Sequence, residues 1–257
     1  MRLLVSVRPE GFPVWDVRSP DLVVGSYVEP LCEMLSYGDH QVMVHDPFDL
    51  IDDRSLLGRC SVVRSRVPLI SLLHVLAQCD GAMLLGYPAM WGAEKGALPR
   101  EGMGKVSALW VNGRRVGPLG LDAMSCSFLG VPVMMVAGDD FLCHEAEALF
   151  EGPRPVTCEI KSSLGADSFV ALAGGAGALM DGAKMSLLGV ADGTLPSVGG
   201  LEGDVLVRIS LSSPSLADAV SLIPSSRRTG PMDVSFTAQD PFEMRRFVAT
   251  ALSLIGG

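Results

Sequence analysis

Residues 1–150 alternate between short apolar runs and longer segments with helical spacing, and this alternation limits the possible folds more than any other feature of the chain. The apolar runs predict strands at residues 3–7, 41–45, 81–85, 106–111 and 131–137. Strands that alternate with helices pack as layers around one core. We therefore predict an α/β fold with a layered N-terminal domain over residues 1–150.

The pattern changes after residue 150. Residues 151–155 (Glu-Gly-Pro-Arg-Pro) are typical of a break between elements, so we predict a smaller α+β domain over residues 151–257. The last element of this domain has the clearest local signal. Asp240 can cap a helix, Pro241 suits the first helical position and Glu243 completes the capping pattern. Apolar residues follow at helical spacing, which predicts a C-terminal helix packed against the domain.

Composition argues against two classes of partner. The formal net charge is −9 and no basic cluster is present, whereas nucleic-acid binding leaves a basic footprint. Hydrophobic residues make up 48% of the chain. The apolar runs nevertheless end before the roughly 18–20 residues that span a bilayer. We therefore expect no nucleic acid and no membrane, and we assign the surplus of apolar residues to the interfaces of a homo- or hetero-oligomer.

The cysteine spacing and the N-terminal sequence indicate the cellular compartment. The 6 cysteines form no C-x-x-C pair and have no regular spacing, and several lie in apolar runs where buried free thiols are common. No basic segment precedes an apolar one at the N-terminus, as a secretory signal would require. We therefore expect a cytoplasmic protein.

Several segments occur in the order and spacing of a known family: VRPEG at 7–11, GYPA at 86–89, VNGRRVGPLGLDA at 111–123 and VPVMMVAGDD at 131–140. They resemble the zinc D-aminopeptidases of the DppA type, and the resemblance covers nearly the whole chain. It implies the fold of those enzymes, a cytoplasmic location and assembly into self-compartmentalising rings.

The zinc site that the resemblance implies is altered at almost every ligand position. The family motifs D-x-E-G, N-D-S-H, G-Y-H-A, M-S-H-S and G-E-L-G-L-N correspond here to Arg8-Pro9-Glu10-Gly11, His45-Asp46-Pro47-Phe48, Gly86-Tyr87-Pro88-Ala89, Leu98-Pro99-Arg100-Glu101 and Gly117-Pro118-Leu119-Gly120-Leu121-Asp122. Zinc needs nitrogen, oxygen or sulfur donors at fixed geometry, proline and phenylalanine supply none, and arginine repels the cation. We therefore predict a diverged member without the metal, without another cofactor and without metallopeptidase activity.

The same positions predict an altered cleft. If the family geometry is kept, two guanidinium groups face carboxylates beside apolar walls. We predict catalytic roles for Glu10, Asp46 and Arg100. The predicted substrate contacts are Arg8, His45, Phe48, Tyr87, Pro88, Glu101 and Pro118. Arginine presents a planar fork for sulfate, phosphate or carboxylate, and a desolvated carboxylate can hold an ammonium or take its proton. The cleft is therefore expected to bind a small molecule with an amine and an anionic group.

Two functions remain open at this point. One is a repurposed, metal-independent enzyme of specialised (natural-product) biosynthesis, in which a substrate amine closes a ring and a sulfate or phosphate departs. Such a step needs positioning and charge stabilisation only. The alternative is a non-catalytic subunit of a hetero-oligomeric complex, with Arg8 and Glu10 paired in the space of the former metal site.

Other residues have competing interpretations. His45 stands beside Asp46, so an acid–base pair is conceivable, but a structural histidine fits the pattern better. Asp139 and Asp140 follow a predicted strand, where capping of a helix is favoured over paired catalytic carboxylates. The glycines at 174, 175 and 177 lack the remainder of a phosphate-loop motif.

Overall fold

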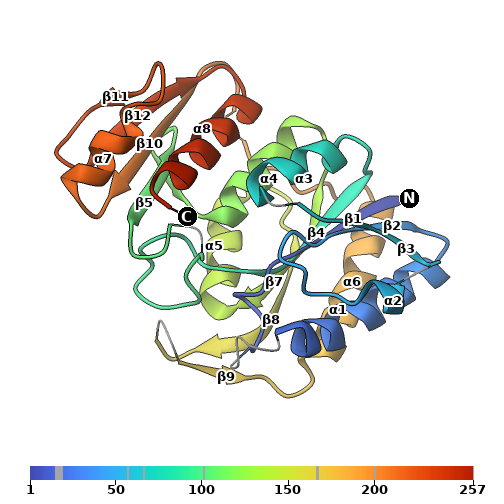
Figure 1. The fold of residues 1–257 in the computed structure, drawn as a ribbon. Coiled ribbons are helices and arrows are strands. Elements are labelled where there is room, and N and C mark those ends of the chain that lie inside the picture. Colours follow the sequence, from blue (N-terminus) through green and yellow to red (C-terminus); the bar gives the residue numbers. More distant parts are fainter. Residues whose placement is uncertain are drawn as a thin grey trace.

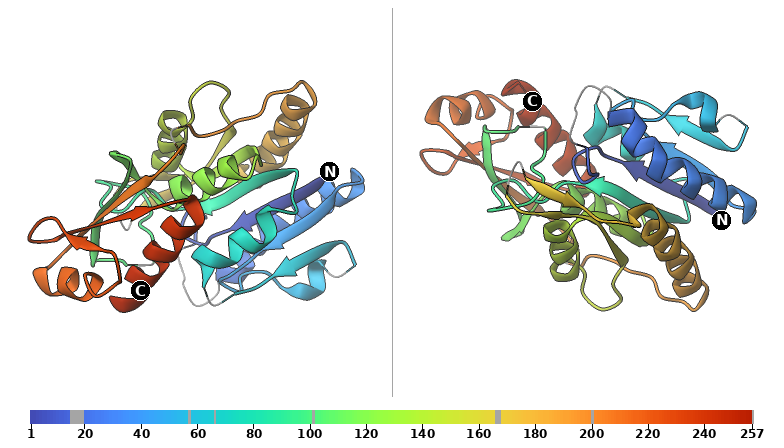
Figure 2. Two further views of the ribbon diagram at one scale, coloured as in Figure 1. Left: turned by 90° about the horizontal axis from the view of Figure 1, so that it is seen from above. Right: turned by 90° about the horizontal axis from the view of Figure 1, so that it is seen from below.

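The computed structural model describes residues 1–14, 20–56, 58–65, 67–100, 102–165, 168–199 and 201–256. Its strands form a 7-stranded sheet in the order β3-β2-β1-β4-β7-β8-β9 and a 5-stranded sheet in the order β11-β12-β10-β5-β6. Figures 1 and 2 show the smaller sheet and its helices set to one side of the larger sheet, with the N-terminus on the far side.

The larger sheet is parallel except at one edge, where β9 runs antiparallel to β8. Its strands are β1 (Arg2–Val7), β2 (Gln41–His45), β3 (Cys60–Val63), β4 (Gly81–Tyr87), β7 (Val133–Asp139), β8 (Val156–Ser163) and β9 (Phe169–Ala171). The central strands β1, β4 and β7 are buried along almost their whole length, as expected for parallel strands covered on both faces.

Helices cover both faces of this sheet. The helices in the described part of the chain are α1 (Pro20–Tyr37), α2 (Asp53–Leu56), α3 (Pro68–Leu76), α4 (Pro118–Phe128), α5 (Asp140–Leu149), α6 (Gly175–Ala191), α7 (Pro214–Val220) and α8 (Pro241–Leu254). Of these, α7 and α8 pack on the smaller sheet. Alternate side chains of β1 show the two cores: Leu3 and Val5 pack with α1 and α6, whereas Leu4 packs with α3, α4 and α5. None of the helices in the described part of the chain is long and apolar enough to cross a membrane.

The smaller sheet is antiparallel and combines segments that are far apart in the sequence. Its strands are β5 (Val106–Val111), β6 (Arg114–Val116), β10 (Val205–Leu211), β11 (Arg227–Arg228) and β12 (Asp233–Ala238). Strands β5 and β6 precede residue 150 and belong to the smaller sheet, whereas β8 and β9 follow residue 150 and belong to the larger sheet, which α6 covers. Each sheet therefore contains strands from both sides of the predicted boundary between residues 150 and 151. The reason is that the chain leaves the larger sheet after β4 and returns to it through α4.

The predicted strands and caps agree with the structure. The α/β fold is confirmed, and β2 and β5 have the predicted ends. Helix α1 continues through Pro30. Asp139 caps α5, where its Oδ1 accepts a 2.8 Å hydrogen bond from the backbone N–H of Leu142. Asp240 caps α8 in the same way through the N–H of Glu243, at 2.7 Å.

Candidate functional site

A cavity of about 600 Å³ opens at the carboxyl ends of the strands of the larger sheet. Glu10 follows β1, Ser163 ends β8 and Phe169 begins β9, and all of them line the cavity together with Arg100 and Lys161. Ligands of parallel α/β sheets bind at this edge. The cavity is therefore the candidate functional site.

Glu10 is the carboxylate of the cavity, and its two oxygens differ. The side chain is 4% exposed, and Oε1 accepts hydrogen bonds of 3.2 Å from Nη2 of Arg8 and from the backbone N–H of Arg100. Oε2 is buried and has no hydrogen-bond partner among the described residues. An unsatisfied buried polar atom costs about 1–3 kcal/mol, so Oε2 is suited to a donor that a ligand brings.

Arg8 is held on the inner side of Glu10. Its side chain is buried, and its guanidinium carbon lies 5.1 Å from the ring centre of Phe48 and 5.6 Å from that of Tyr87. Aromatic faces stabilise a buried cation. Of the predicted substrate contacts, Arg8 lies against Glu10, and Phe48 and Tyr87 lie against Arg8. None of these three residues lines the cavity.

Arg100 lies on the open side. Its side chain is exposed and lines the cavity, while its backbone N–H holds Glu10. The segment before it is fixed by Asp139, whose Oδ2 accepts 2.6 Å and 3.1 Å hydrogen bonds from the N–H of Ala97 and the hydroxyl of Ser163. Glu101, a predicted substrate contact, lies outside the described residues.

Lys161 is a cavity residue that the sequence analysis did not single out. It is buried near the end of β8, and its Nζ donates to the carbonyl oxygens of Glu10 and, at 3.2 Å, Phe12. The ammonium also lies 4.9 Å from the ring centre of Phe169. Burial lowers the pKa of Lys161, whereas the charges of Asp139 and Glu10 oppose that shift. Lys161 stands among the polar residues Glu159, Ser162 and Ser163, so no sequence pattern marks it as a buried side chain.

Asp46 is not brought to the cavity. Its carboxylate accepts hydrogen bonds from the backbone N–H of Leu50, at 3.0 and 2.8 Å, and of Ile51, at 3.0 Å, and it lies 3.5 Å from Nη1 of Arg64. Burial raises the pKa of Asp46 and these partners oppose the shift. The carboxylate of Asp46 is thus engaged in fixing the loop after β2, whereas Glu10 lines the cavity.

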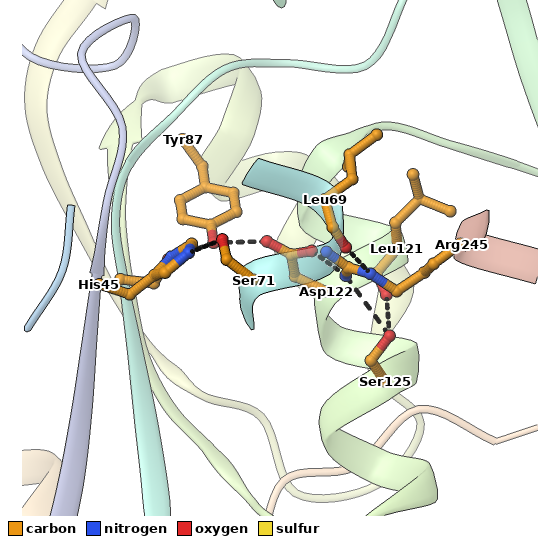
Figure 3. Close-up of polar contacts among 9 residues, drawn as sticks. His45, Leu69, Ser71, Tyr87, Leu121, Asp122, Ser125 and Arg245 are labelled. Carbon is orange, nitrogen blue, oxygen red and sulfur yellow. Dashed lines mark hydrogen bonds and ion pairs between the residues drawn. The ribbon is translucent and has the colours of Figure 1, made fainter. Parts of the chain in front are cut away.

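His45 and Tyr87 belong to a buried chain of hydrogen bonds (Figure 3). The two ring nitrogens of His45 lie 2.6 Å from the hydroxyl of Ser71 and 3.1 Å from that of Ser6. Ser6 in turn lies 2.8 Å from the Tyr87 hydroxyl, which donates to Asp122 at 2.5 Å. Burial lowers the pKa of His45 to about 4, so the imidazole is neutral. The geometry favours the structural interpretation of His45 over an acid–base pair with Asp46.

This chain of hydrogen bonds ends at a buried ion pair. Arg245, from α8, pairs with Asp122 of α4, and its Nε donates to the carbonyl oxygen of Leu69 at 2.5 Å (Figure 3). Nη1 of Arg245 also lies 3.4 Å from the hydroxyl of Ser125. Arg245 is fully buried, so every charged contact of this group is made inside the protein.

Pro88 and Pro118 form buried backbone features. Pro118 is the first residue of α4, the position where a missing N–H is tolerated, and Pro88 directly follows β4. The backbone that follows β1 is tightly packed against the end of β4: the N–H of Gly11 donates to the carbonyl of Gly86 at 2.7 Å. Gly86 has φ of +67°, and a Cβ there would lie 2.1 Å from the carbonyl oxygen of Arg8. Only glycine fits where these two backbone segments come so close together.

The donor set at the positions equated with zinc ligands does not fit the ion. Glu10 offers a carboxylate, but the guanidinium of Arg8 lies against it, and Pro88 and Pro118 have no donor atoms. No group of three or more His, Cys, Asp or Glu side chains that could hold a metal occurs within the described ranges.

Comparisons with known proteins agree with this fold. The sequence profile of the D-aminopeptidase family, peptidase family M55, matches residues 28–250. The D-aminopeptidase of Bacillus subtilis (strain 168) is 27% identical over 219 residues, which are 83% of this chain and 78% of the relative. The structure is also similar to that of the Zn-dependent D-aminopeptidase DppA from Bacillus subtilis, a self-compartmentalizing protease, with a TM-score of 0.87 and 23% identity over 99% of this chain and 97% of the other. Because the family profile extends over most of the sequence, the chain belongs to the D-aminopeptidase family.

Proposed function

We propose that this protein is a metal-independent member of its family that acts on a small substrate with an amine and an anionic group. The proposal depends chiefly on Oε2 of Glu10, which is buried and has no hydrogen-bond partner among the described residues. A substrate ammonium would supply the missing donor. The exposed guanidinium of Arg100 lines the same cavity and suits the anionic end of that molecule.

The neighbouring residues hold this arrangement in place. Arg8 and the backbone N–H of Arg100 bind Oε1, which leaves Oε2 for the substrate. Lys161 fixes the backbone on either side of Gly11 through the carbonyl oxygens of Glu10 and Phe12. Arg8 and Lys161 are thus positioning residues, and Glu10 and Arg100 are the groups that would touch the substrate.

The specific reaction that we propose is ring closure within the substrate. The ammonium gives a proton to Oε2 of Glu10, and the amine attacks the carbon that bears a sulfate or phosphate. A C–N bond forms, the C–O bond breaks, and its electron pair leaves with the anion, whose charge Arg100 stabilises. Reacting groups of one molecule need only orientation for this step. The product class would suit specialised metabolism, in a cytoplasmic oligomer.

A minimal substrate tests the proposal. 2-Aminoethyl hydrogen sulfate carries both groups, and ethanolamine and ethyl sulfate each carry one. We expect the first to stabilise the protein by about 1.4 kcal/mol at ten times its Kd, and the other two to have little effect. The Glu10→Gln variant should lose this stabilisation and any sulfate release. Equal responses to all three compounds, or unchanged sulfate release by the variant, would exclude the proposed role of Glu10.

Zinc is tested separately. Protein purified after growth with added zinc should contain far less than one equivalent of the metal, measured by native mass spectrometry and elemental analysis. Replacing Arg8 with Asp and Pro88 with His would restore two donor types of the family motif and should raise zinc content if the alignment of these positions is right. Stoichiometric zinc in the unaltered protein would contradict the metal-independent mechanism.

The alternative, a non-catalytic subunit, is favoured by one observation. Arg8 fills the space beside Glu10 and is packed against Phe48 and Tyr87, as in a site that has been closed. Native mass spectrometry of the protein produced together with the products of neighbouring genes distinguishes the two functions. A defined hetero-oligomer combined with no response to 2-aminoethyl hydrogen sulfate would favour the subunit.

A further inference from the structure

A pair of cysteines lies on the face of the larger sheet opposite to α3, α4 and α5. Cys32 is on α1 and Cys60 begins β3, the edge strand, and both pack in the core between α1 and the sheet. The Cys60 sulfur lies 3.6 Å from the hydroxyl of Ser36, which is one helical turn beyond Cys32 on the same face of α1. The same Ser36 hydroxyl donates to the carbonyl oxygen of Cys32 at 2.8 Å, so that Ser36 contacts both cysteines.

Cys60 differs from the other cysteines in its access to solvent. All 6 cysteines are free, and Cys60 is half-buried whereas the other cysteines are buried. Cys60 lines a second cavity, of about 440 Å³, together with Arg59 and His40. A small polar oxidant or alkylating reagent can therefore reach Cys60 while Cys32 remains beneath it.

The surroundings also favour the thiolate of Cys60. Hydrogen bonds from Cys32 and Ser36 and the charge of Arg59 lower the pKa of Cys60 to about 6, against the effect of burial. Burial raises the pKa of Cys79, Cys126, Cys143 and Cys158, and contact with Cys60 together with burial raises that of Cys32. The thiolate is the nucleophilic form of cysteine, so reaction is directed to a single thiol.

We propose that Cys60 and Cys32 are an oxidation-sensitive pair, in which a hydroperoxide oxidises Cys60 and Cys32 then closes a disulfide between α1 and β3. In the first step the Cys60 thiolate attacks the terminal peroxide oxygen. An S–O bond forms, the O–O bond breaks, and hydroxide or alkoxide leaves, so that sulfur is oxidised and the peroxide is reduced by two electrons. In the second step the Cys32 sulfur bonds to Cys60, its proton joins the departing oxygen, and water leaves.

Selective alkylation of the unmodified protein is the first test. At pH 7, a small excess of iodoacetamide followed by peptide mass spectrometry should label Cys60 at least about tenfold faster than Cys158, whose pKa burial raises to about 11. The rate at Cys60 should rise through an apparent pKa near 6. Labelling of Cys60 no faster than that of Cys158 would overturn the proposal without any substitution that might disturb folding.

Oxidation tests the pair itself. After treatment with hydrogen peroxide, non-reducing peptide mapping should find Cys32 linked to Cys60, and dithiothreitol should remove the link. Cys32→Ser should leave a sulfenic acid on Cys60 that dimedone traps, Cys60→Ser should prevent both products, and Cys79→Ser is the matched control that keeps the link. A peroxide-treated protein with Cys60 modified but never joined to Cys32, or with the link formed equally among other cysteines, would contradict the assignment.

Discussion

At the scale of single residues, the structure separates charged groups that line the cavity from those that are engaged within the fold. Glu10 and Asp46 are both buried acidic residues, yet Asp46 accepts backbone hydrogen bonds on both oxygens and Glu10 leaves Oε2 without one among the described residues. The family motifs assign Arg8, Phe48 and Tyr87 to one cleft, and in the structure Phe48 and Tyr87 lie against the guanidinium of Arg8 without lining the cavity. Lys161 could not be predicted in the same way, because its contacts join β8 to the chain after β1 and depend on tertiary packing.

The buried imidazole of His45 should make stability depend on pH. Its pKa falls from 6.5 to about 4 in the folded protein, so the unfolded chain binds more protons between these values. The contribution of the neutral imidazole to the free energy of unfolding is complete above pH 6.5 and is lost as the pH falls toward 4. Urea unfolding should show about 2 kcal/mol less stability from this residue at pH 5 than at pH 7.5. His45→Gln should show a flatter pH dependence, and equal slopes in both proteins would refute this explanation.

Glu145 of α5 should have the opposite dependence. Its carboxylate oxygens are buried, and burial raises its pKa from 4.5 to about 8, although the backbone of Gly117 and Met90 opposes the shift. The folded protein therefore binds more protons than the unfolded chain, so that stability is full below pH 4.5 and declines as the pH rises toward 8. Glu145→Gln should be more stable than the unaltered protein at pH 8.5, by at least about 1 kcal/mol, and the difference should shrink at pH 5. A variant that is less stable at both values would show that the carboxylate is needed in its charged form.

At the scale of elements, local signals predicted the ends of helices better than the grouping of strands. The capping pattern of Asp240, Pro241 and Glu243 is a property of adjacent residues, and α8 begins where it predicts. By contrast, β5 and β6 join a sheet whose other strands follow residue 200, and no local pattern reports that pairing. Residues 151–155, where the domain boundary is predicted, lie between α5 and β8, and each sheet takes strands from both sides of this segment.

The cap of α8 gives a prediction for one element. Asp240→Ala removes the acceptor for the N–H of Glu243 and should lower the free energy of unfolding by about 1 kcal/mol. Asp240→Asn keeps an acceptor and should change stability by only a few tenths of a kcal/mol. Both values can be measured by urea denaturation. If alanine and asparagine have the same effect, the side-chain cap does not stabilise the helix.

At the scale of the whole molecule, the polar link between α8 and the larger sheet joins the two parts of the fold. Helix α8 packs on the smaller sheet through β12 and on α3 and α4 of the larger one. Arg245 extends from α8 to Asp122 on α4 and to the Leu69 carbonyl on α3. Asp122 in turn accepts a hydrogen bond from the hydroxyl of Tyr87 on β4. One side chain thus bridges both layers, and its loss should affect the stability of the whole protein.

A double-mutant cycle measures this link. Arg245→Met leaves Asp122 as a buried charge without its partner and should destabilise the protein by about 3–5 kcal/mol. Asp122→Asn keeps an acceptor for Tyr87 while removing the charge, so that the double variant should be more stable than the sum of the two single effects predicts, by about 1 kcal/mol or more. Chemical denaturation followed by two probes, tryptophan fluorescence and circular dichroism, gives each value. Additive effects would mean that the ion pair does not couple the helices, and the union of the two sheets would then depend on the apolar contacts of α8, such as those of Phe247 and Leu252.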